Sequence, residues 1–197
     1  MLSSGEPGLL RHCDVPVVPG VSHVGFRRSS NEGLASSGLS SVGAARPSAR
    51  ERILFYSVSD EYGELSNFAP YPIRLDGVQW PTTEHFFQAQ KFSDADVREQ
   101  IRRAPNPGEA ARIGRSRKLR LRPNWDSAKV GVMRRAVRAK FEQHPDLAAL
   151  LLATGDAEIV EHTERDAFWG DGGDGRGENV LGRILMEVRS MLKGSAH

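Results

Sequence analysis

Two long amphipathic segments in the C-terminal half of the chain place the strongest limits on its fold. In the first, from about residue 126 to residue 144, Val130, Met133, Val137 and Phe141 recur at helical spacing. In the second, residues 179–194, the apolar residues again share one helical face: Leu181, Ile184, Leu185, Val188, Met191 and Leu192. Each apolar stripe must be buried against a core, so we expect a fold built mainly from packed helices.

Shorter elements are predicted around these two helices. Residues 52–57 and 157–163 are rich in β-branched or aromatic residues and predict strands, and Asp76-Gly77 has the composition of a two-residue hairpin turn. Further helices are expected from Thr82 or Thr83 through Phe92, over 94–103, over 106–116 and over 145–155. The fold class predicted is mainly α (α+β), a compact helical domain with a small N-terminal β-hairpin or sheet.

The chain divides by composition into a tail and one domain. Residues 1–50 are rich in Gly, Ser and Pro and lack periodicity, so we expect a disordered tail. We assign the ordered domain to residues 51–194, because 197 residues of which 39% are hydrophobic suffice for one core.

Charge, cysteine content and hydropathy exclude several classes of protein. A formal charge of +2 is far from that of a dedicated nucleic-acid binder, so any such role would depend on a local patch. The single cysteine, Cys13, cannot form an internal disulfide, and no zinc-ligand spacing occurs. No apolar run reaches the roughly 20 residues that span a bilayer. We therefore expect a cytoplasmic protein with no membrane association.

The segment "WPTTEHFFQAQKF" carries an unusual polar stripe. Glu84, Gln88 and Lys91 stand at i, i+4 and i+7, which places them on one face of a helix. A solvated face with a weak ion pair is the ordinary interpretation. The phenylalanines on both sides instead favour a partly desolvated carboxylate, a candidate base or cation stabiliser. His85 is expected to be a packed histidine and not a ligand.

A glycine-rich segment, "HTERDAFWGDGGDGRGEN" at residues 162–179, is the second candidate. It lacks the spacing of a calcium loop or of a dinucleotide-binding turn, and a plain surface loop is one interpretation. Phe168 and Trp169 are costly to expose, which favours a ligand-binding loop. Asn179 is expected to cap the last helix, whose positive end would face an anion.

Two further segments are candidate binding elements. The basic run of residues 102–125 contains arginines that mostly belong to solvated faces, but one or two could bind a phosphate, with Trp125 offering a flat face to a heterocycle. This run alone is weak evidence for nucleic acid. Ser66, Asn67 and Phe68 form a polar loop for which a simple turn is the ordinary interpretation.

These segments, taken in order, resemble the NADAR family, and specifically its YbiA-like branch. The resemblance extends from about Ile53 to Leu192 and includes the strings "FYSVSDEYGELSNFAPYPI", "DGVQWPTTEHFFQAQKF", "IRRAPNPGEAARIGR", "RPNWDSAKVGVMRRAVRAKFEQHPDLAALLLATG" and "VEHTERDAFWGDGGDGRGENVLGRILMEVR". It implies a mainly helical fold and an N-glycosidase, a hydrolase of N-glycosyl compounds that needs neither a metal nor a cofactor.

The resemblance also implies a substrate class. YbiA-like members are associated with hydrolysis of the bond between ribose 5-phosphate and the base of early, reactive riboflavin intermediates, so a small phosphorylated riboside is the expected partner. Other members act on ADP-ribose attached to guanine in DNA, and only under that alternative would nucleic acid bind. A non-catalytic module that binds ADP-ribose is a third interpretation.

Site residues are carried over from the family by their motifs. The family's active-site glutamate matches Glu84, its tryptophan matches Trp125, and its acidic and aromatic loop matches Asp166, Trp169 and Asp171. We expect Glu84 to stabilise a cationic sugar and activate water, with Asp166 as the second catalytic acid. The expected substrate-binding residues are Asn67, Gln88, Lys91, Arg112, Trp125, Trp169 and Asp171, of which Lys91 and Arg112 would contact phosphate.

Overall fold

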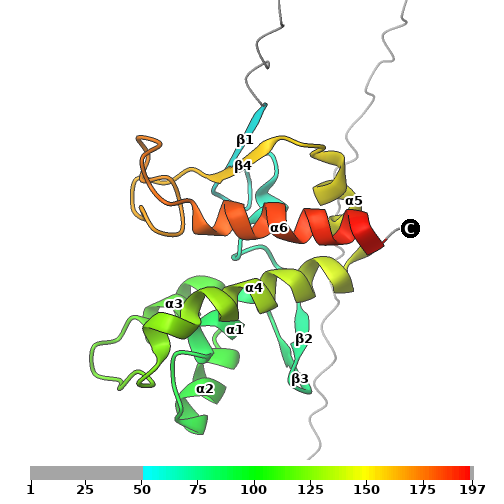
Figure 1. Ribbon diagram of the computed structural model, residues 1–197. Coiled ribbons are helices and arrows are strands. Elements are labelled where there is room, and N and C mark those ends of the chain that lie inside the picture. The colour runs from blue at the N-terminus through cyan, green and yellow to red at the C-terminus, as the bar shows by residue number, and fades with distance from the viewer. Residues whose placement is uncertain (1–50, 196–197) are drawn as a thin grey trace, which may run out of the picture. The chain divides into compact units, whose positions relative to one another are not determined.

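The computed structural model describes residues 51–195, in which helices predominate and strands are short (Figure 1). The helices are α1 (Thr83–Ala89), α2 (Ala95–Arg102), α3 (Pro107–Gly114), α4 (Trp125–Gln143), α5 (Pro145–Ala153) and α6 (Val180–Ser195). The strands are β1 (Arg52–Phe55), β2 (Ile73–Leu75), β3 (Val78–Trp80) and β4 (Glu158–Glu161), and a 3-10 turn spans Gly63–Leu65. The prediction of a mainly helical α+β domain is confirmed. The expected tail and Cys13 lie outside the described residues.

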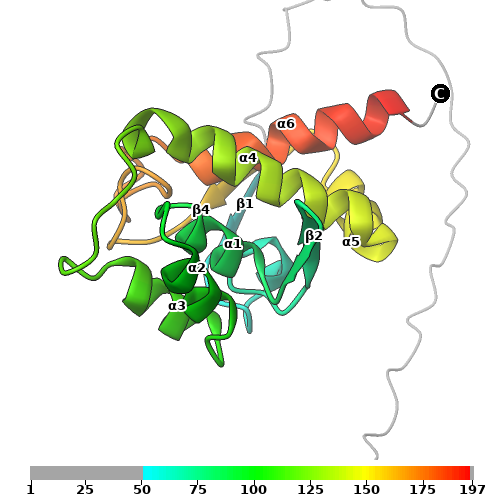
Figure 2. The ribbon, with the colours of Figure 1, turned by 90° about the horizontal axis from the view of Figure 1, so that it is seen from below.

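The two long amphipathic helices pack side by side, as both ribbon views show (Figure 2). Their buried residues include Met133, Val137 and Phe141 of α4 and Leu181, Ile184, Leu185 and Val188 of α6. The prediction that Met191 faces inward is wrong, because its side chain is 40% exposed. At about 100° per residue, Met191 lies at the margin of the arc centred on Leu181 and Val188.

The strands form two separate sheets of two strands each, and not one N-terminal unit. β2 and β3 form the expected antiparallel hairpin, with φ angles of 54° at Asp76 and 77° at Gly77, as a type I′ turn requires. β1 instead pairs in parallel with β4, and Phe55 is opposite Glu161. This pairing joins the start of the domain to the segment that precedes the glycine-rich loop.

Helix α6 lies very close to β4. A Cβ atom on Gly182 would stand 2.1 Å from the carbonyl oxygen of Ile159, so only glycine permits this approach. Asn179 joins the same two elements, because its Nδ2 donates to Ile159 O (2.9 Å) and its Oδ1 accepts from Glu161 N (3.1 Å). The expected side-chain cap by Asn179 is wrong, since its amide is committed to the strand.

The N-terminus of α6 does not face an anion. The N–H groups of Val180 and Leu181 donate to the carbonyl oxygens of Phe168 (3.1 Å) and Trp169 (3.0 Å). The glycine-rich loop therefore closes this helix end. Among residues 51–195, no helix has the length and apolar content needed to cross a membrane.

Candidate active site

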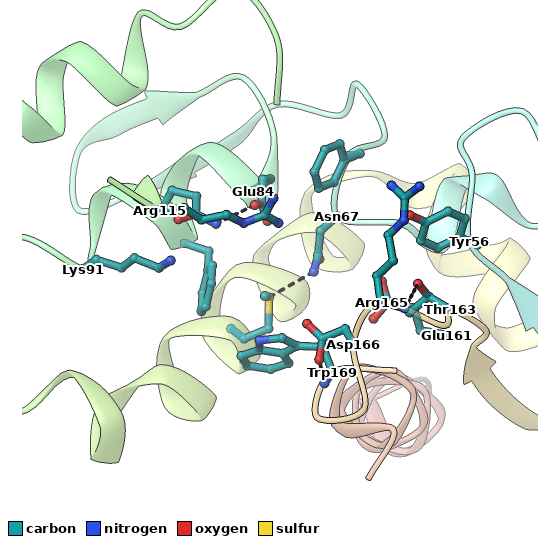
Figure 3. Close-up of a pocket in the computed structure, with 14 residues that line it drawn as sticks. Tyr56, Asn67, Glu84, Lys91, Arg115, Glu161, Thr163, Arg165, Asp166 and Trp169 are labelled. Carbon is teal, nitrogen blue, oxygen red and sulfur yellow. Dashed lines mark hydrogen bonds between the residues drawn. The ribbon is translucent and has the colours of Figure 1, made fainter. Parts of the chain in front are cut away.

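A cavity of about 530 Å³ lies between α1, the end of β4 and the glycine-rich loop (Figure 3). It brings together most of the residues expected at a site: Asn67, Glu84, Gln88, Lys91, Asp166 and Trp169. Side chains that were not expected there line it as well, and the most relevant are Tyr56, Arg115, Glu161 and Arg165.

Helix α1 brings its polar stripe to this cavity. The helix begins after Thr82, whose hydroxyl accepts from His85 N (3.3 Å), and it ends at Ala89, three residues before the predicted Phe92. His85 is buried and its ring nitrogens contact Thr82 Oγ1 (2.8 Å) and Ala104 O (3.2 Å), so the prediction of a packed histidine is confirmed. The neighbouring Glu84 faces the cavity.

Glu84 is a buried carboxylate with an organised set of partners. Only 5% of the residue is exposed, and its Oε1 accepts a 2.7 Å hydrogen bond from Gln88 Nε2. Burial raises the pKa of Glu84, whereas the Gln88 hydrogen bond and the positive charges of Lys91 and Arg115 act to lower it. Burial is the largest of these effects, so the pKa stays above its usual value, and the three partners reduce the cost of the ionised form.

Gln88 is held against the bare backbone at the end of α3. A Cβ atom on Gly114 would stand 2.0 Å from Gln88 Oε1, so a larger residue would displace the amide. Lys91 Nζ donates to the carbonyl oxygen of Gly114 (3.3 Å), which ties the same helix end to α1. The sequence predicts a helix over 106–116 but does not show that Gly114 lies against Gln88.

Asn67 presents an amide to the cavity from the loop before the hairpin. Its Oδ1 accepts from Thr83 Oγ1 (3.1 Å), and its main-chain oxygen accepts from Glu84 N (3.2 Å). Its Nδ2 points to the sulfur of Met133 at 3.3 Å, which is a weak acceptor. A ligand oxygen would be a better partner for this N–H group, so Asn67 is a candidate substrate contact and not a simple turn residue.

Asp166 and Asp171 have different positions in the glycine-rich loop. Asp166 lines the cavity, and its Oδ1 accepts from Phe168 N (2.9 Å) and Trp169 N (2.8 Å). Asp171 lies behind the cavity wall, where it accepts from His162 Nδ1 (2.9 Å) and from loop N–H groups. Burial acts to raise the pKa of Asp171, but these hydrogen bonds lower it below its usual value. Asp171 therefore organises the loop and does not face the cavity.

Two other residues that were expected to contact substrate, Arg112 and Trp125, do not line the cavity. Arg112 points outward, with 72% of its side chain exposed and a 2.6 Å ion pair to Glu109. Trp125 is buried, and its ring centroid lies 5.1 Å from that of Phe87. Trp125 does not line the cavity but packs against Phe87, which does, and Trp169 is the tryptophan that lines the cavity.

Glu161 is the acidic residue of the cavity that the sequence did not single out. It is the last residue of β4, it lines the cavity, and its Oε2 is buried without a hydrogen-bond partner among residues 51–195. Burial raises the pKa of Glu161 to about 7, and the charges of Asp166, Glu84 and Asp171 act in the same direction. In "EIVE" the two-residue period of a strand places Glu161 on the same face as Ile159, but a charged residue at the end of a short strand is ordinarily interpreted as solvated.

The cavity contains both carboxylates and cationic side chains. This combination suits a polar ligand that carries an anionic group and develops positive charge at a different atom. Carboxylates from α1, β4 and the loop meet cationic side chains and the apolar faces of Phe87 and Trp169, whose rings lie edge to face at 5.3 Å. In the described part of the chain, no three His, Cys, Asp or Glu side chains form a group that could hold a metal ion.

The comparisons with known proteins agree with this architecture. The sequence model of the NADAR domain matches residues 54–193. The chain is 62% identical over 140 residues to N-glycosidase YbiA of Escherichia coli, a match that covers 71% of this chain and 88% of that protein. It is 49% identical over 144 residues to riboflavin biosynthesis protein VVA0006 of Vibrio vulnificus, covering 73% of this chain and 39% of that protein.

A solved structure is similar as well. The NMR structure of Escherichia coli YbiA superimposes with a TM-score of 0.70 at 59% identity, covering 75% of this chain and 88% of that chain. The fold and its carboxylate-lined cavity thus define an enzyme that hydrolyses N-glycosyl compounds. The chain belongs to the NADAR family.

Proposed function

We propose that this enzyme hydrolyses the N-glycosidic bond of phosphoribosylamino-pyrimidine intermediates of riboflavin biosynthesis and releases ribose 5-phosphate. The observation that carries this proposal is Glu84, a buried carboxylate facing a cavity that also contains cationic side chains. The names of the relatives, N-glycosidase and riboflavin biosynthesis protein, support the reaction and the substrate class. Removal of reactive or excess intermediates would be the physiological role.

Glu84 is assigned to the sugar. When an N-riboside breaks, positive charge develops on C1 and the ring oxygen while the bonding electrons move to the base. A carboxylate beneath the sugar stabilises that charge and orients or deprotonates the attacking water. Gln88 fixes the carboxylate, and Lys91 and Arg115 favour its ionised form.

Asp166, Asn67 and Trp169 are assigned to the remaining parts of the riboside. Asp166 Oδ1 already accepts from the loop, so its carboxylate acts as an acceptor and suits the ribose hydroxyl groups. Asn67 Nδ2 would donate to a sugar or base oxygen. Trp169 offers a flat face to the heterocycle, and stacking on an aromatic ring tolerates different bases.

The phosphate is assigned to Arg165 and Tyr56. Their side chains lie together on one side of the cavity, whereas Lys91 and Arg115 lie on the other side, near Glu84 (Figure 3). The phosphate is attached to C5 of the ribose and therefore stays away from C1, where Glu84 acts. An exposed guanidinium can bind phosphate with two parallel hydrogen bonds. This assignment replaces the earlier one of Lys91 and Arg112.

Hydrolysis of ADP-ribosylated guanine is a second candidate function, because a basic loop begins at the cavity. The loop that begins with Arg115 at the cavity also carries exposed Arg117, Lys118 and Arg120. A nucleic-acid strand that enters beside Arg115 would meet these positive charges.

Direct comparison of two substrates tests the proposal. Purified protein is incubated with 5-amino-6-(5-phosphoribosylamino)uracil or with a single-stranded oligonucleotide carrying ADP-ribosylated guanine, and kcat/KM is measured for each. We expect the riboside to be the better substrate, and Arg165→Gln to raise KM for it while Arg176→Gln, which changes an arginine outside the cavity, has no effect. Preference for the oligonucleotide would support the second candidate instead.

A further inference from the structure

Glu161 occupies a rigid position in the cavity. Its N–H donates to Asn179 Oδ1 (3.1 Å), and its carbonyl oxygen accepts from Asp171 N (2.9 Å). A Cβ atom on Gly170 would stand 2.6 Å from that carbonyl oxygen, so the loop packs directly on the end of the strand. The main chain is fixed on both sides, and the side chain projects into the same cavity as Glu84 (Figure 3).

The surroundings of Glu161 differ from those of Glu84. Glu84 has a hydrogen bond from Gln88 and two nearby cations, whereas Glu161 Oε2 is buried and receives no hydrogen bond from residues 51–195. An unpaired carboxylate is costly to bury, but a protonated carboxyl group is far less so and can donate a hydrogen bond. The two environments thus differ in the donors and cations that they offer to a carboxylate, and a difference of this kind distinguishes base from acid in enzymes with paired carboxyl groups.

The ionisable groups around Glu161 add to this difference. Burial raises the pKa of Glu161 to about 7, and three acids act in the same direction. Burial raises the pKa of Glu84 as well, but there the hydrogen bond from Gln88 and the charges of Lys91 and Arg115 oppose the rise. The titratable and charged side chains that line the cavity with Glu161 are Tyr56, Glu84, Lys91, Arg115, Arg165 and Asp166, and Asp171 acts on Glu161 through its charge.

We propose that Glu161 is the general acid of the reaction, a second catalytic carboxyl group that protonates the leaving base. This inference rests on the proposed function. As the bond between C1 and nitrogen breaks, its electron pair moves to nitrogen, which takes the proton of Glu161. Water attacks C1 and gives a proton to Glu84, so the products are ribose 5-phosphate and the free aminopyrimidine. The proton on Glu84 then returns to Glu161 through solvent, which restores both groups.

The pH profile of the reaction tests this role. With 5-amino-6-(5-phosphoribosylamino)uracil as substrate, kcat/KM of the wild type should fall as pH rises through about 7, because Glu161 loses its proton there. Glu161→Gln should lower kcat by about 10² to 10⁴ and abolish that basic limb. Glu161→Asp, which keeps an acid, should retain the limb at a reduced rate. Glu158→Gln, on the same strand but outside the cavity, should behave as the wild type.

Stability measurements separate a catalytic role from a structural one. A carboxyl group with a raised pKa binds more protons folded than unfolded, so it costs stability as pH rises through the window from about 4.5 to about 7. Glu161→Gln should therefore be at least as stable as the wild type at pH 8.

Two results would contradict the account in different ways. A folded Glu161→Gln variant that keeps the wild-type rate and basic limb overturns the role of Glu161 alone. Absence of ribose 5-phosphate release by the wild type overturns the proposed function, and the assignment of Glu161 with it.

Discussion

Gln88 Nε2 donates a 2.7 Å hydrogen bond to Glu84 Oε1, one helical turn earlier on α1. Both residues are buried, and Gln88 in turn lies against the backbone of Gly114. The orientation of the proposed catalytic carboxylate is therefore set by a contact between α1 and α3. Changes at Gln88 or Gly114 should affect catalysis although neither residue supplies a reacting group.

Gln88→Leu should slow the reaction and shift its acidic limb. The Gln88 hydrogen bond lowers the pKa of Glu84, so its loss raises that pKa, and the ionised form appears only at higher pH. A hydrogen bond to a charged group contributes about 1.5 to 3 kcal/mol, so the acidic limb should move measurably to higher pH. The measurement is the pH profile of kcat/KM, with Gln79→Leu on the exposed side of β3 as the control. An unmoved acidic limb would refute this role.

Gly114→Ala should reduce activity with little loss of stability. The new methyl group would displace the Gln88 amide, and misplacement of a catalytic group can cost about 10- to 100-fold in rate. Alanine also favours the helix by up to about 1 kcal/mol, which offsets the displaced side chain. In Gly131→Ala, the matched control in α4, the added Cβ meets nothing within 4 Å, so this variant should gain stability and keep full activity. Equal activity of the two variants would show that Gln88 tolerates the displacement.

Replacement of Trp169 should change KM, whereas replacement of Trp125 should change the free energy of unfolding. Trp169→Ala removes the face offered to the base, worth about 1 to 3 kcal/mol, and should raise KM about tenfold or more. Trp125→Phe alters packing behind Phe87 and should lower the free energy of unfolding by about 1 to 3 kcal/mol while KM is unchanged. Denaturant titration and steady-state kinetics on both variants provide the check. A raised KM in Trp125→Phe would place this ring at the substrate after all.

Lys140 should make stability depend on pH in the alkaline range. Burial lowers its pKa to about 7, although Nζ donates to Glu64 O and Ser66 O in the loop that carries Asn67. The unfolded state binds more protons between about pH 7 and the normal lysine value, so this group stabilises the fold increasingly as pH rises through that window. Lys140→Met should lose that rise in the free energy of unfolding, and Lys118→Met, at an exposed position, should retain it. Parallel curves for the wild type and Lys140→Met would contradict this linkage.

Much of the fold is predictable from local sequence patterns. The stripes on α4 and α6, the Asp76-Gly77 turn and the ends of α3 and α5 follow from periodicity, capping and turn chemistry. The pairing of β1 with β4 does not, since parallel strands about a hundred residues apart leave no local signal. The two hydrogen bonds of the Asn179 side chain to β4 also leave no local signal, since Asn179 lies about twenty residues after this strand.

The site was predictable where the sequence joins polar and aromatic residues on one helix. Glu84, Gln88 and Lys91 share a stripe, and the structure places all three at the cavity. Arg112 and Arg115 could not be separated by sequence, because both are arginines at the end of α3 and only the structure shows that Arg115 lines the cavity. Glu161 was missed because its surroundings come from distant segments: Glu84 on α1 and Asp166 in the following loop.

The most direct test of the central claim is release of ribose 5-phosphate from 5-amino-6-(5-phosphoribosylamino)uracil by the wild type and by Glu84→Gln. The substitution keeps the size of the buried side chain, and the thermal unfolding curve confirms that the variant is folded. We expect rapid release by the wild type and by Glu158→Gln, and release by Glu84→Gln reduced by about 10² or more. A folded Glu84→Gln variant with wild-type turnover would contradict the account.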